Sequence, residues 1–308
     1  MIVSCSRRTD VPSFYADWLL GRLRAGFALV PHPYNPRKLT GVSLDPMAVD
    51  CLVLWTKDPG PLMGHLAEMD ARGWRYYFEF TLNPYGPDLE PGLPPKEELV
   101  ATFQALSQRL GRERVDWRYD PIVFSPTYPV SFHLRSLAAL GERLAPWASR
   151  LIISFVDQYR HGPKLSGGTE AERLELAAGL ARLGESWGLP IYACAEAMDL
   201  RAFGVKPSAC LDRAKIEGLT GRPLRVRKDP GQRQACLCLE SVDLGVYNSC
   251  SRLCAYCYAN AKPSLAVARW RAHDPRRPTL TGELSEGAEI VRWLGERRDD
   301  WEVGLAKL

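Results

Sequence analysis

The chain has 308 residues, of which 46% are hydrophobic, so it can bury a substantial core and its composition excludes an intrinsically disordered protein. Its formal charge of +4 is weaker than the basic bias expected of a nucleic-acid-binding protein. No apolar run approaches the roughly 18 residues of a membrane span, and the first residues lack the apolar stretch of a signal peptide, so we expect a cytoplasmic protein without a membrane partner.

Short apolar segments alternate with helix-length amphipathic segments along the first two-thirds of the chain. The pattern predicts strands at 2–6, 51–55, 76–82, 115–124, 151–156 and 191–194, and helices at 14–25, 60–72, 96–111, 132–144 and 170–187. Such alternation is typical of βαβ units and predicts a parallel sheet. With about six units and no G-x-G-x-x-G turn after the first strand, it favours a TIM-barrel-like α/β fold, complete or partial, over a Rossmann fold.

The composition changes after about Arg222, where a basic, turn-rich run leads into a group of cysteines. We therefore predict a barrel-like domain at 1–232 and a C-terminal cysteine-rich, cluster-binding segment at 233–308. Its loop at 233–262 is expected to pack over the mouth of the barrel, and its tail to contain one helix near 284–297. The basic run at 222–233 is either a solvated loop or a path for phosphates.

Polar side chains gather where the predicted strands end. Because the carboxyl ends of barrel strands carry the chemistry of barrel enzymes, these side chains predict an active-site face. Arg118 and Asp120 are two residues apart and share one face of their strand, where they form part of the site or a structural ion pair. The candidate catalytic residues are Arg7, Arg8, Asp10, Lys57, Glu79, Arg118, Asp120, Asp157 and Glu196.

The nine cysteines are an odd number in a chain without an export signal, which argues against a disulfide framework. Cys250, Cys254 and Cys257 have the spacing C-x3-C-x2-C, with Tyr256 directly before the last cysteine. Three thiolates this close can bind three irons of one [4Fe–4S] cluster and leave the fourth iron open. Zinc is the alternative metal, since it also takes closely spaced cysteines.

A second metal site is suggested by Cys236 and Cys238, which form a C-x-C just before this triad. Cys194, at the end of a predicted strand, and Cys210, in the following loop, would bring the number of thiolates to four. Four thiolates complete either a fully ligated [4Fe–4S] cluster or a zinc site. The alternative is that Cys194 and Cys210 are small buried hydrophobic residues.

The C-x3-C-x2-C spacing with its aromatic residue resembles the signature of the radical S-adenosylmethionine (SAM) superfamily. The resemblance implies that SAM chelates the open iron and is cleaved reductively to a 5′-deoxyadenosyl radical. It also implies that Tyr256 contacts the adenine of SAM, and Tyr258 and Asn260 are further candidates for cofactor binding. The chain departs from the superfamily pattern because its triad follows the last predicted strands and it has no Gly-Gly-Glu motif.

Several short motifs are spread along the chain: Ser6-Arg-Arg-Thr-Asp10, Trp55-Thr-Lys57, Phe80-Thr-Leu-Asn-Pro-Tyr85, Trp117-Arg-Tyr-Asp-Pro121, Ile153-Ser-Phe-Val-Asp157, Cys194-Ala-Glu196 and the stretch 236–260. Through them nearly the whole chain resembles the bacterial and archaeal domain of unknown function 1848 family. Around Cys257 the chain is also similar to spore photoproduct lyase, a radical SAM enzyme of DNA repair.

Together these features predict an iron–sulfur enzyme of radical SAM type that contains one [4Fe–4S] cluster or two. Arg7, Lys57 and Arg118 are expected to favour an anionic substrate, and a reductant such as ferredoxin or flavodoxin is expected to supply electrons. One alternative is a radical SAM enzyme that acts on nucleic acid. The other is a non-radical binding protein with a structural four-cysteine zinc or iron–sulfur site.

Overall fold

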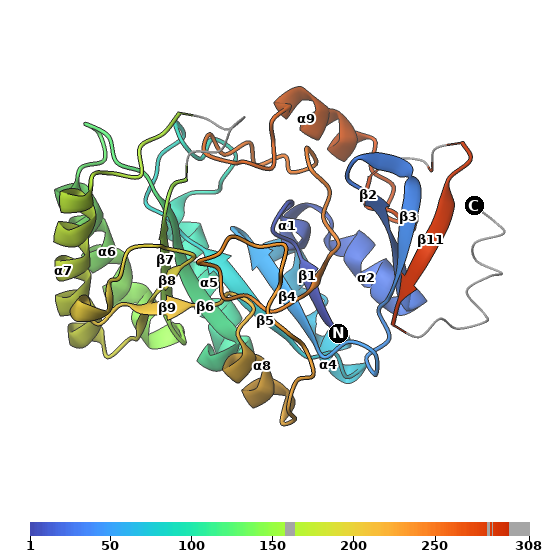
Figure 1. Ribbon diagram of the computed structural model, residues 1–308, viewed down its shortest axis with the longest axis horizontal. Coiled ribbons are helices and arrows are strands. Elements are labelled where there is room, and N and C mark those ends of the chain that lie inside the picture. Colours follow the sequence, from blue (N-terminus) through green and yellow to red (C-terminus); the bar gives the residue numbers. More distant parts are fainter. Residues whose placement is uncertain (158–163, 282–283, 285, 296–308) are drawn as a thin grey trace.

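The computed structural model describes residues 1–157, 164–281, 284 and 286–295. Its centre is a sheet of eight parallel strands flanked by helices (Figure 1). The order across the sheet is β10-β1-β4-β5-β6-β7-β8-β9. The strands are β1 (Ile2–Cys5), β4 (Cys51–Thr56), β5 (Tyr76–Thr81), β6 (Val115–Ile122), β7 (Leu151–Phe155), β8 (Ile191–Cys194), β9 (Lys206–Ser208) and β10 (Val242–Asp243). The predicted α/β fold with a parallel sheet is confirmed.

Helices join most of these strands, as parallel pairing requires. They are α1 (Val11–Phe14), α2 (Ala16–Ala25), α3 (Gly60–Met63), α4 (Leu66–Ala71), α5 (Lys96–Leu110), α6 (Val130–Leu144), α7 (Glu170–Trp187), α8 (Arg213–Thr220) and α9 (Pro263–Arg271), with short 3-10 turns at Arg112–Arg114, Ala145–Trp147 and Arg201–Phe203. Each predicted strand and helix of the first 194 residues is present, although the helix predicted at 60–72 is divided into α3 and α4. None of the described helices is long and apolar enough to cross a membrane.

Successive side chains of a strand point to opposite sides of the sheet, so its two faces carry different residues. On one face, apolar side chains pack under the helices, as Phe80 does against Phe103 of α5 with ring centroids 5.1 Å apart. The opposite face, called here the inner face, carries Tyr77 and Glu79 of β5 and Arg118 of β6. Side chains two residues apart on a strand point the same way, so this charged row follows from the register of the two strands.

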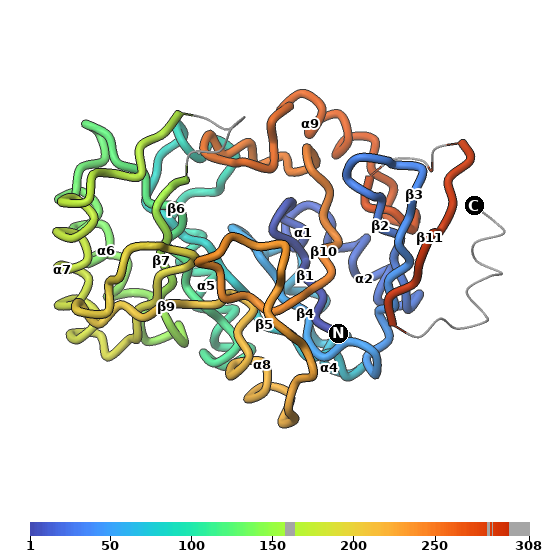
Figure 2. Tube along the Cα trace, in the orientation of Figure 1, coloured from blue at the N-terminus to red at the C-terminus, as the bar shows by residue number. Residues whose placement is uncertain are grey.

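The segment between β9 and β10 covers the inner face. Leu211, Leu224 and Leu239 of this segment pack with Val53 and Tyr77 in one buried cluster. Figure 2 shows the chain after α8 running back across the strands to reach β10 beside β1. Among the described strand pairs, β9 and β10 are the two ends of the sheet and are not paired to each other. This segment thus covers the polar inner face, although the described strands do not close into a ring.

A second, three-stranded sheet corrects the prediction for the tail. Strands β2 (Phe27–His32) and β3 (Asn35–Ser43) form an antiparallel hairpin that the sequence analysis missed, and β11 (Glu289–Leu294) pairs parallel to β3. The helix predicted near 284–297 is therefore wrong for the residues of β11, while 285, 296 and 297 lie outside the described residues. Pairing with β3 and packing of Trp293 on Phe27 favour a strand there.

Candidate functional site

The three cysteines of the C-x3-C-x2-C motif lie on an irregular segment between β10 and α9, residues 250–260, called here the triad loop. Burial raises the pKa of all three thiols, that of Cys254 to about 11. The thiol of Cys257 lies close enough to those of Cys250 and Cys254 to raise their pKa values electrostatically. Cys257 thus lies within electrostatic range of the other two cysteines, and the metal site that the spacing predicts stays a prediction.

Backbone geometry in the triad loop turns N–H groups toward sulfur. Leu253, between the first two cysteines, has a φ of 56°, a left-handed conformation that costs a branched residue about 1–2 kcal/mol. The Cys257 thiol accepts from the backbone N–H groups of Ala259 and Asn260, and the Cys250 thiol accepts from that of Arg252. Such hydrogen bonds stabilise negative charge on sulfur and tune the potential of an iron–sulfur cluster.

Asp10 and Arg252 fasten the triad loop to the carboxyl ends of β1 and β4. The Asp10 carboxylate accepts from Thr56 Oγ1 at 2.6 Å and from the Lys57 backbone N–H at 2.9 Å. Arg252 reaches Asp58 at 2.9 Å and Asp10 at 3.8 Å. Both carboxylates follow strands of the sheet, so the loop is positioned on the edge where barrel enzymes carry their active sites.

Beside the triad, a buried lysine–carboxylate network includes the aromatic residue of the motif. Lys57 Nζ donates to Glu90 Oε1 at 2.8 Å, and the hydroxyl of Tyr256 donates to the same oxygen. Asn83 Nδ2 lies 3.3 Å from both Glu90 Oε1 and the Tyr256 hydroxyl oxygen. Burial lowers the pKa of Lys57, but Glu90 and, next, Cys254 outweigh it and hold the pKa above its usual value. A cation therefore faces Cys254.

The remaining predicted cofactor-binding residues also lie in the triad loop. Asn260 Nδ2 donates to the Cys250 carbonyl at 2.6 Å, and the hydroxyl of Tyr258, 40% exposed, donates to the Arg7 carbonyl at 2.9 Å. Asn260 Oδ1 and Ser251 Oγ are buried without a hydrogen-bond partner among the described residues. Buried polar atoms normally have partners, so these two atoms remain able to bond to a ligand or to water.

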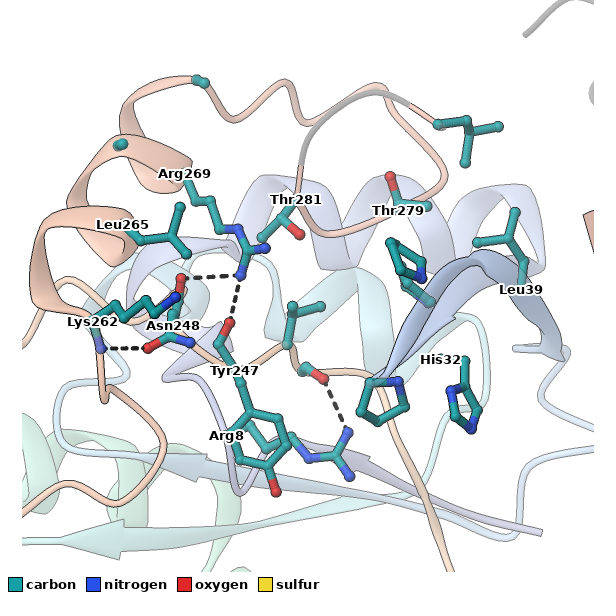
Figure 3. Close-up of a pocket in the computed structure, with 18 residues that line it drawn as sticks. Arg8, His32, Leu39, Tyr247, Asn248, Lys262, Leu265, Arg269, Thr279 and Thr281 are labelled. Carbon is teal, nitrogen blue, oxygen red and sulfur yellow. Dashed lines mark hydrogen bonds between the residues drawn. The ribbon is translucent and has the colours of Figure 1, made fainter. Parts of the chain in front are cut away.

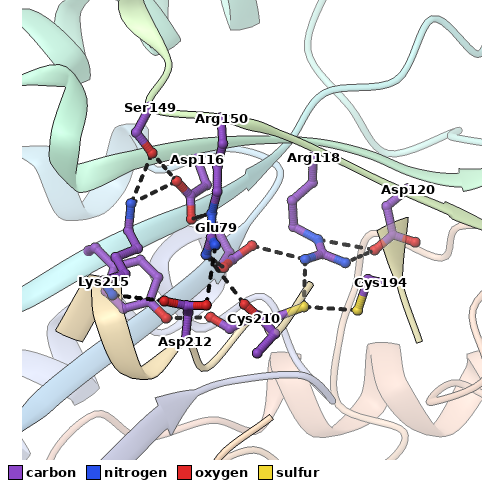
Figure 4. Close-up of polar contacts among 12 residues, drawn as sticks. Glu79, Asp116, Arg118, Asp120, Ser149, Arg150, Cys194, Cys210, Asp212 and Lys215 are labelled. Atoms are coloured by element: carbon purple, nitrogen blue, oxygen red, sulfur yellow. Dashed lines mark hydrogen bonds and ion pairs between the residues drawn. The ribbon is translucent and has the colours of Figure 1, made fainter. Parts of the chain in front are cut away.

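Arg118 is the centre of the charged row on the inner face (Figure 4). It is 3% exposed, donates from Nη1 to Glu79 Oε2 at 2.9 Å, and forms an ion pair with Asp120. Ser154 donates to the other oxygen of Asp120. Burial raises the pKa of Glu79, which is fully enclosed. Arg118 and Asp120 therefore form an ion pair, and Glu79 extends it.

A neighbouring buried network holds the amino-terminal end of β6. Arg150 Nε donates to Asp116 Oδ2 at 2.9 Å, and Lys215 Nζ, from α8, donates to Asp116 Oδ1 at 2.7 Å. Burial raises the pKa of Asp116, but Lys215 and Arg150 outweigh it and leave the pKa below its usual value. Asp116, Arg150 and Lys215 were not predicted, because single charged residues at strand and helix ends carry no distinguishing sequence signal.

The other four cysteines of the predicted second site also meet, on the inner face. Sγ of Cys194 lies 3.0 Å from Sγ of Cys210, which lies 2.8 Å from Nη1 of Arg118. Cys238 shares side-chain hydrogen bonds with Cys210 and with Cys236. We call these four residues the interior cysteines. Among the described residues, no group of three or more His, Cys, Asp or Glu side chains has a geometry that holds a metal ion as it stands.

The remaining predicted catalytic residues lie apart from the triad loop's thiols. Arg7 contacts Asp243 at 3.8 Å and Asp229 at 4.0 Å. Glu196 accepts from the Phe155 backbone N–H at 2.8 Å, and burial raises its pKa. Asp157 forms a half-exposed ion pair with Arg233. Because Arg7, Lys57 and Arg118 are each paired with carboxylates, none of the three is an uncompensated cation for a substrate.

A pocket of about 640 Å³ lies between the β2–β3 hairpin, the stretch 245–248 and α9 (Figure 3). Its lining includes the cations Arg8, Lys262 and Arg269, and no Asp or Glu among the described residues. Arg8 stacks over Tyr247 at 4.9 Å, and Arg269 donates to the Tyr247 carbonyl at 2.7 Å. The wall formed by 245–248 continues directly into the triad loop. Arg8 is the predicted catalytic residue that lines this pocket; Lys262 and Arg269 were missed.

Residues 2–259 match the model of the family described as Domain of unknown function (DUF1848). The chain belongs to this family. No curated protein matches the sequence. Among solved structures, a candidate alpha-L-fucosidase from Bacteroides thetaiotaomicron VPI-5482 is similar, with 9% identity, a TM-score of 0.27, and coverage of 74% of this chain and 85% of that one. That likeness is too weak to assign a fold or a function.

Proposed function

We propose that this DUF1848 protein is an iron–sulfur enzyme of radical SAM type with a TIM-barrel-like core, in which Cys250, Cys254 and Cys257 hold a [4Fe–4S] cluster. The supporting observation is the position of these three cysteines on one loop at the carboxyl ends of the strands, with backbone N–H groups directed at the thiols of Cys250 and Cys257. When bound, the cluster would supply the electron that cleaves SAM to methionine and a 5′-deoxyadenosyl radical.

The surroundings of the triad fit a bound group of this kind. The orphaned atoms Ser251 Oγ and Asn260 Oδ1 are available to a ligand, and the Lys57 cation offsets negative charge on the thiolates. The Tyr256 hydroxyl is held by Glu90, which fixes the ring beside Cys254. Asn260 would position the Cys250 backbone through its 2.6 Å hydrogen bond.

The substrate is proposed to be a small anion that binds in the pocket of Figure 3. Arg8, Lys262 and Arg269 give this pocket a positive lining that no described carboxylate of the lining neutralises. A volume of about 640 Å³ suits a small molecule. The basic run at 222–233 gives less support to a nucleic acid, since Arg222 pairs with Asp50, Arg227 with Glu240 and Arg233 with Asp157.

The test is SAM cleavage by anaerobically reconstituted, dithionite-reduced protein. We expect 5′-deoxyadenosine to form and the electron paramagnetic resonance signal of the reduced cluster to change when SAM is added. The variant C250A/C254A/C257A is the matched negative control, and Cys51→Ala, which removes a buried cysteine of β4, is the positive one. Absence of both 5′-deoxyadenosine and the spectral change in the wild-type protein would sink the proposal.

A further inference from the structure

The interior cysteines converge from three separate parts of the chain. Cys194 ends β8, Cys210 follows β9, and Cys236 and Cys238 lie on the segment between α8 and β10. Cysteines that are merely small hydrophobic residues have no reason to cluster, because any apolar side chain fills the same space. Cys51 shows that ordinary behaviour: it is fully buried in β4 and its thiol donates to the neighbouring Leu52 carbonyl at 3.6 Å.

We propose that Cys194, Cys210, Cys236 and Cys238 bind one zinc ion as a tetrathiolate site that fastens the segment between β9 and β10 to the inner face of the sheet. The site is distinct from the triad loop and does not depend on the proposed radical chemistry. The zinc ion would link the end of β8 to the segment between β9 and β10, which has little regular structure. A metal crosslink of this kind contributes directly to folding.

The short distance between two of the four sulfurs favours a single ion over a [4Fe–4S] cluster. Zinc binds thiolates at about 2.3 Å in a tetrahedron, so its neighbouring sulfurs lie about 3.8 Å apart. The 3.0 Å between the sulfurs of Cys194 and Cys210 is shorter than this by less than an ångström. A small separation of these two sulfurs would give them the spacing of zinc ligands, although the present arrangement does not itself hold a metal. A [4Fe–4S] cluster, whose four cysteines bind separate irons, requires a wider cage.

Two guanidinium groups lie beside the interior cysteines, although each also pairs with carboxylates. Four thiolates and one divalent ion carry a net formal charge of about −2, which is costly to bury alone. Arg118 lies 2.8 Å from the Cys210 sulfur, and Arg7 is in electrostatic contact with Cys210 and Cys238. A buried guanidinium donates far more strongly to a thiolate than to a neutral thiol. The contact at Cys210 would therefore strengthen if its sulfur were a metal-bound thiolate.

The experiment measures zinc and iron in full-length protein purified without added metal from cells supplied with both. We expect one zinc per chain in the wild type, in C250A/C254A/C257A and in the matched control Cys51→Ala, and none in C236S/C238S. Zinc-edge X-ray absorption of C250A/C254A/C257A should show four sulfur neighbours at about 2.3 Å. The X-ray absorption spectrum identifies the zinc ligands even if C236S/C238S does not fold.

Four results would overturn the zinc site. The first is zinc that persists in C236S/C238S, and the second is zinc that disappears from C250A/C254A/C257A. The third is iron, rather than zinc, lost specifically from C236S/C238S, which would mean a second cluster. The fourth is a native protein without zinc whose intact mass and peptide map show a disulfide between Cys194 and Cys210.

Discussion

The two groups of cysteines lie in surroundings of opposite character. The interior cysteines emerge at or near strands, face a guanidinium held by carboxylates, and are covered by apolar side chains. The triad lies on an irregular loop at the strand ends, where backbone N–H groups face the Cys257 thiol and two buried polar atoms of the loop have no hydrogen-bond partner among the described residues. The first environment suits a permanent crosslink and the second suits a reactive group with exchangeable ligands. We therefore expect interior variants to affect stability and triad variants to affect activity.

The largest expected effect is the loss of activity in Cys254→Ala. Removing one of three cluster ligands should lower 5′-deoxyadenosine formation by about 100-fold or more, because the cluster needs all three thiolates. Zinc content should stay at the wild-type level. Anaerobic SAM-cleavage assays with metal analysis check both, and Cys51→Ala controls for loss of a buried thiol. Undiminished cleavage by Cys254→Ala would break the assignment of the triad as the reactive group.

The second prediction concerns the stability of the protein when Arg118, at the centre of the inner face, is replaced. Arg118→Met should lower the free energy of unfolding by about 4 kcal/mol, because the buried Glu79 then keeps only its 3.8 Å contact with Arg150 and the half-buried Asp120 loses its ion pair. Urea unfolding measures the change. Arg276→Ala, which breaks an ion pair of an 88%-exposed side chain, should change stability by no more than about 0.5 kcal/mol. Equal effects of the two substitutions would contradict the structural role of the charged row.

A pH-dependent effect should follow from Asp116. Its pKa is lowered in the folded state, so its stabilising contribution is fully present above its unfolded pKa, about 3.9, and is lost as pH falls through the lower folded value. Asp116→Asn should cost about 3 kcal/mol near pH 7. The difference from wild type should shrink below about pH 4. Unfolding free energies measured across this range test the prediction, and a constant difference would refute it.

The smallest effect is expected in the cationic pocket. Lys262→Ala should weaken binding of inorganic phosphate about tenfold, which corresponds to about 1.4 kcal/mol, because it removes one of three cations. Stability should stay within about 0.5 kcal/mol of wild type, since the side chain is exposed. Calorimetric titration measures the affinity, with Lys38→Ala as a control outside the pocket. Equal phosphate affinity in the two variants would count against an anion site there.

Much of the main sheet was predictable because its strands and helices carry strong local patterns. The buried runs at Cys51–Thr56 and Leu151–Phe155 are strands in the structure, close to their predicted limits. Strand β11 was misread because its pairing partner, β3, is about 250 residues away and leaves no local signal. The β2–β3 hairpin was missed for a related reason: exposed residues at its tip blur the alternation.

The sequence by itself determined which residue types were available for chemistry. The C-x3-C-x2-C spacing, the C-x-C pair and the shared face of Arg118 and Asp120 are local properties, so they could be read directly. Only the tertiary structure decided what these groups face, because that depends on contacts between distant segments. It paired Arg7, Lys57 and Arg118 with carboxylates and brought Cys194 and Cys210 to within 3.0 Å. It also gathered Arg8, Lys262 and Arg269 in a pocket whose described lining has no carboxylate.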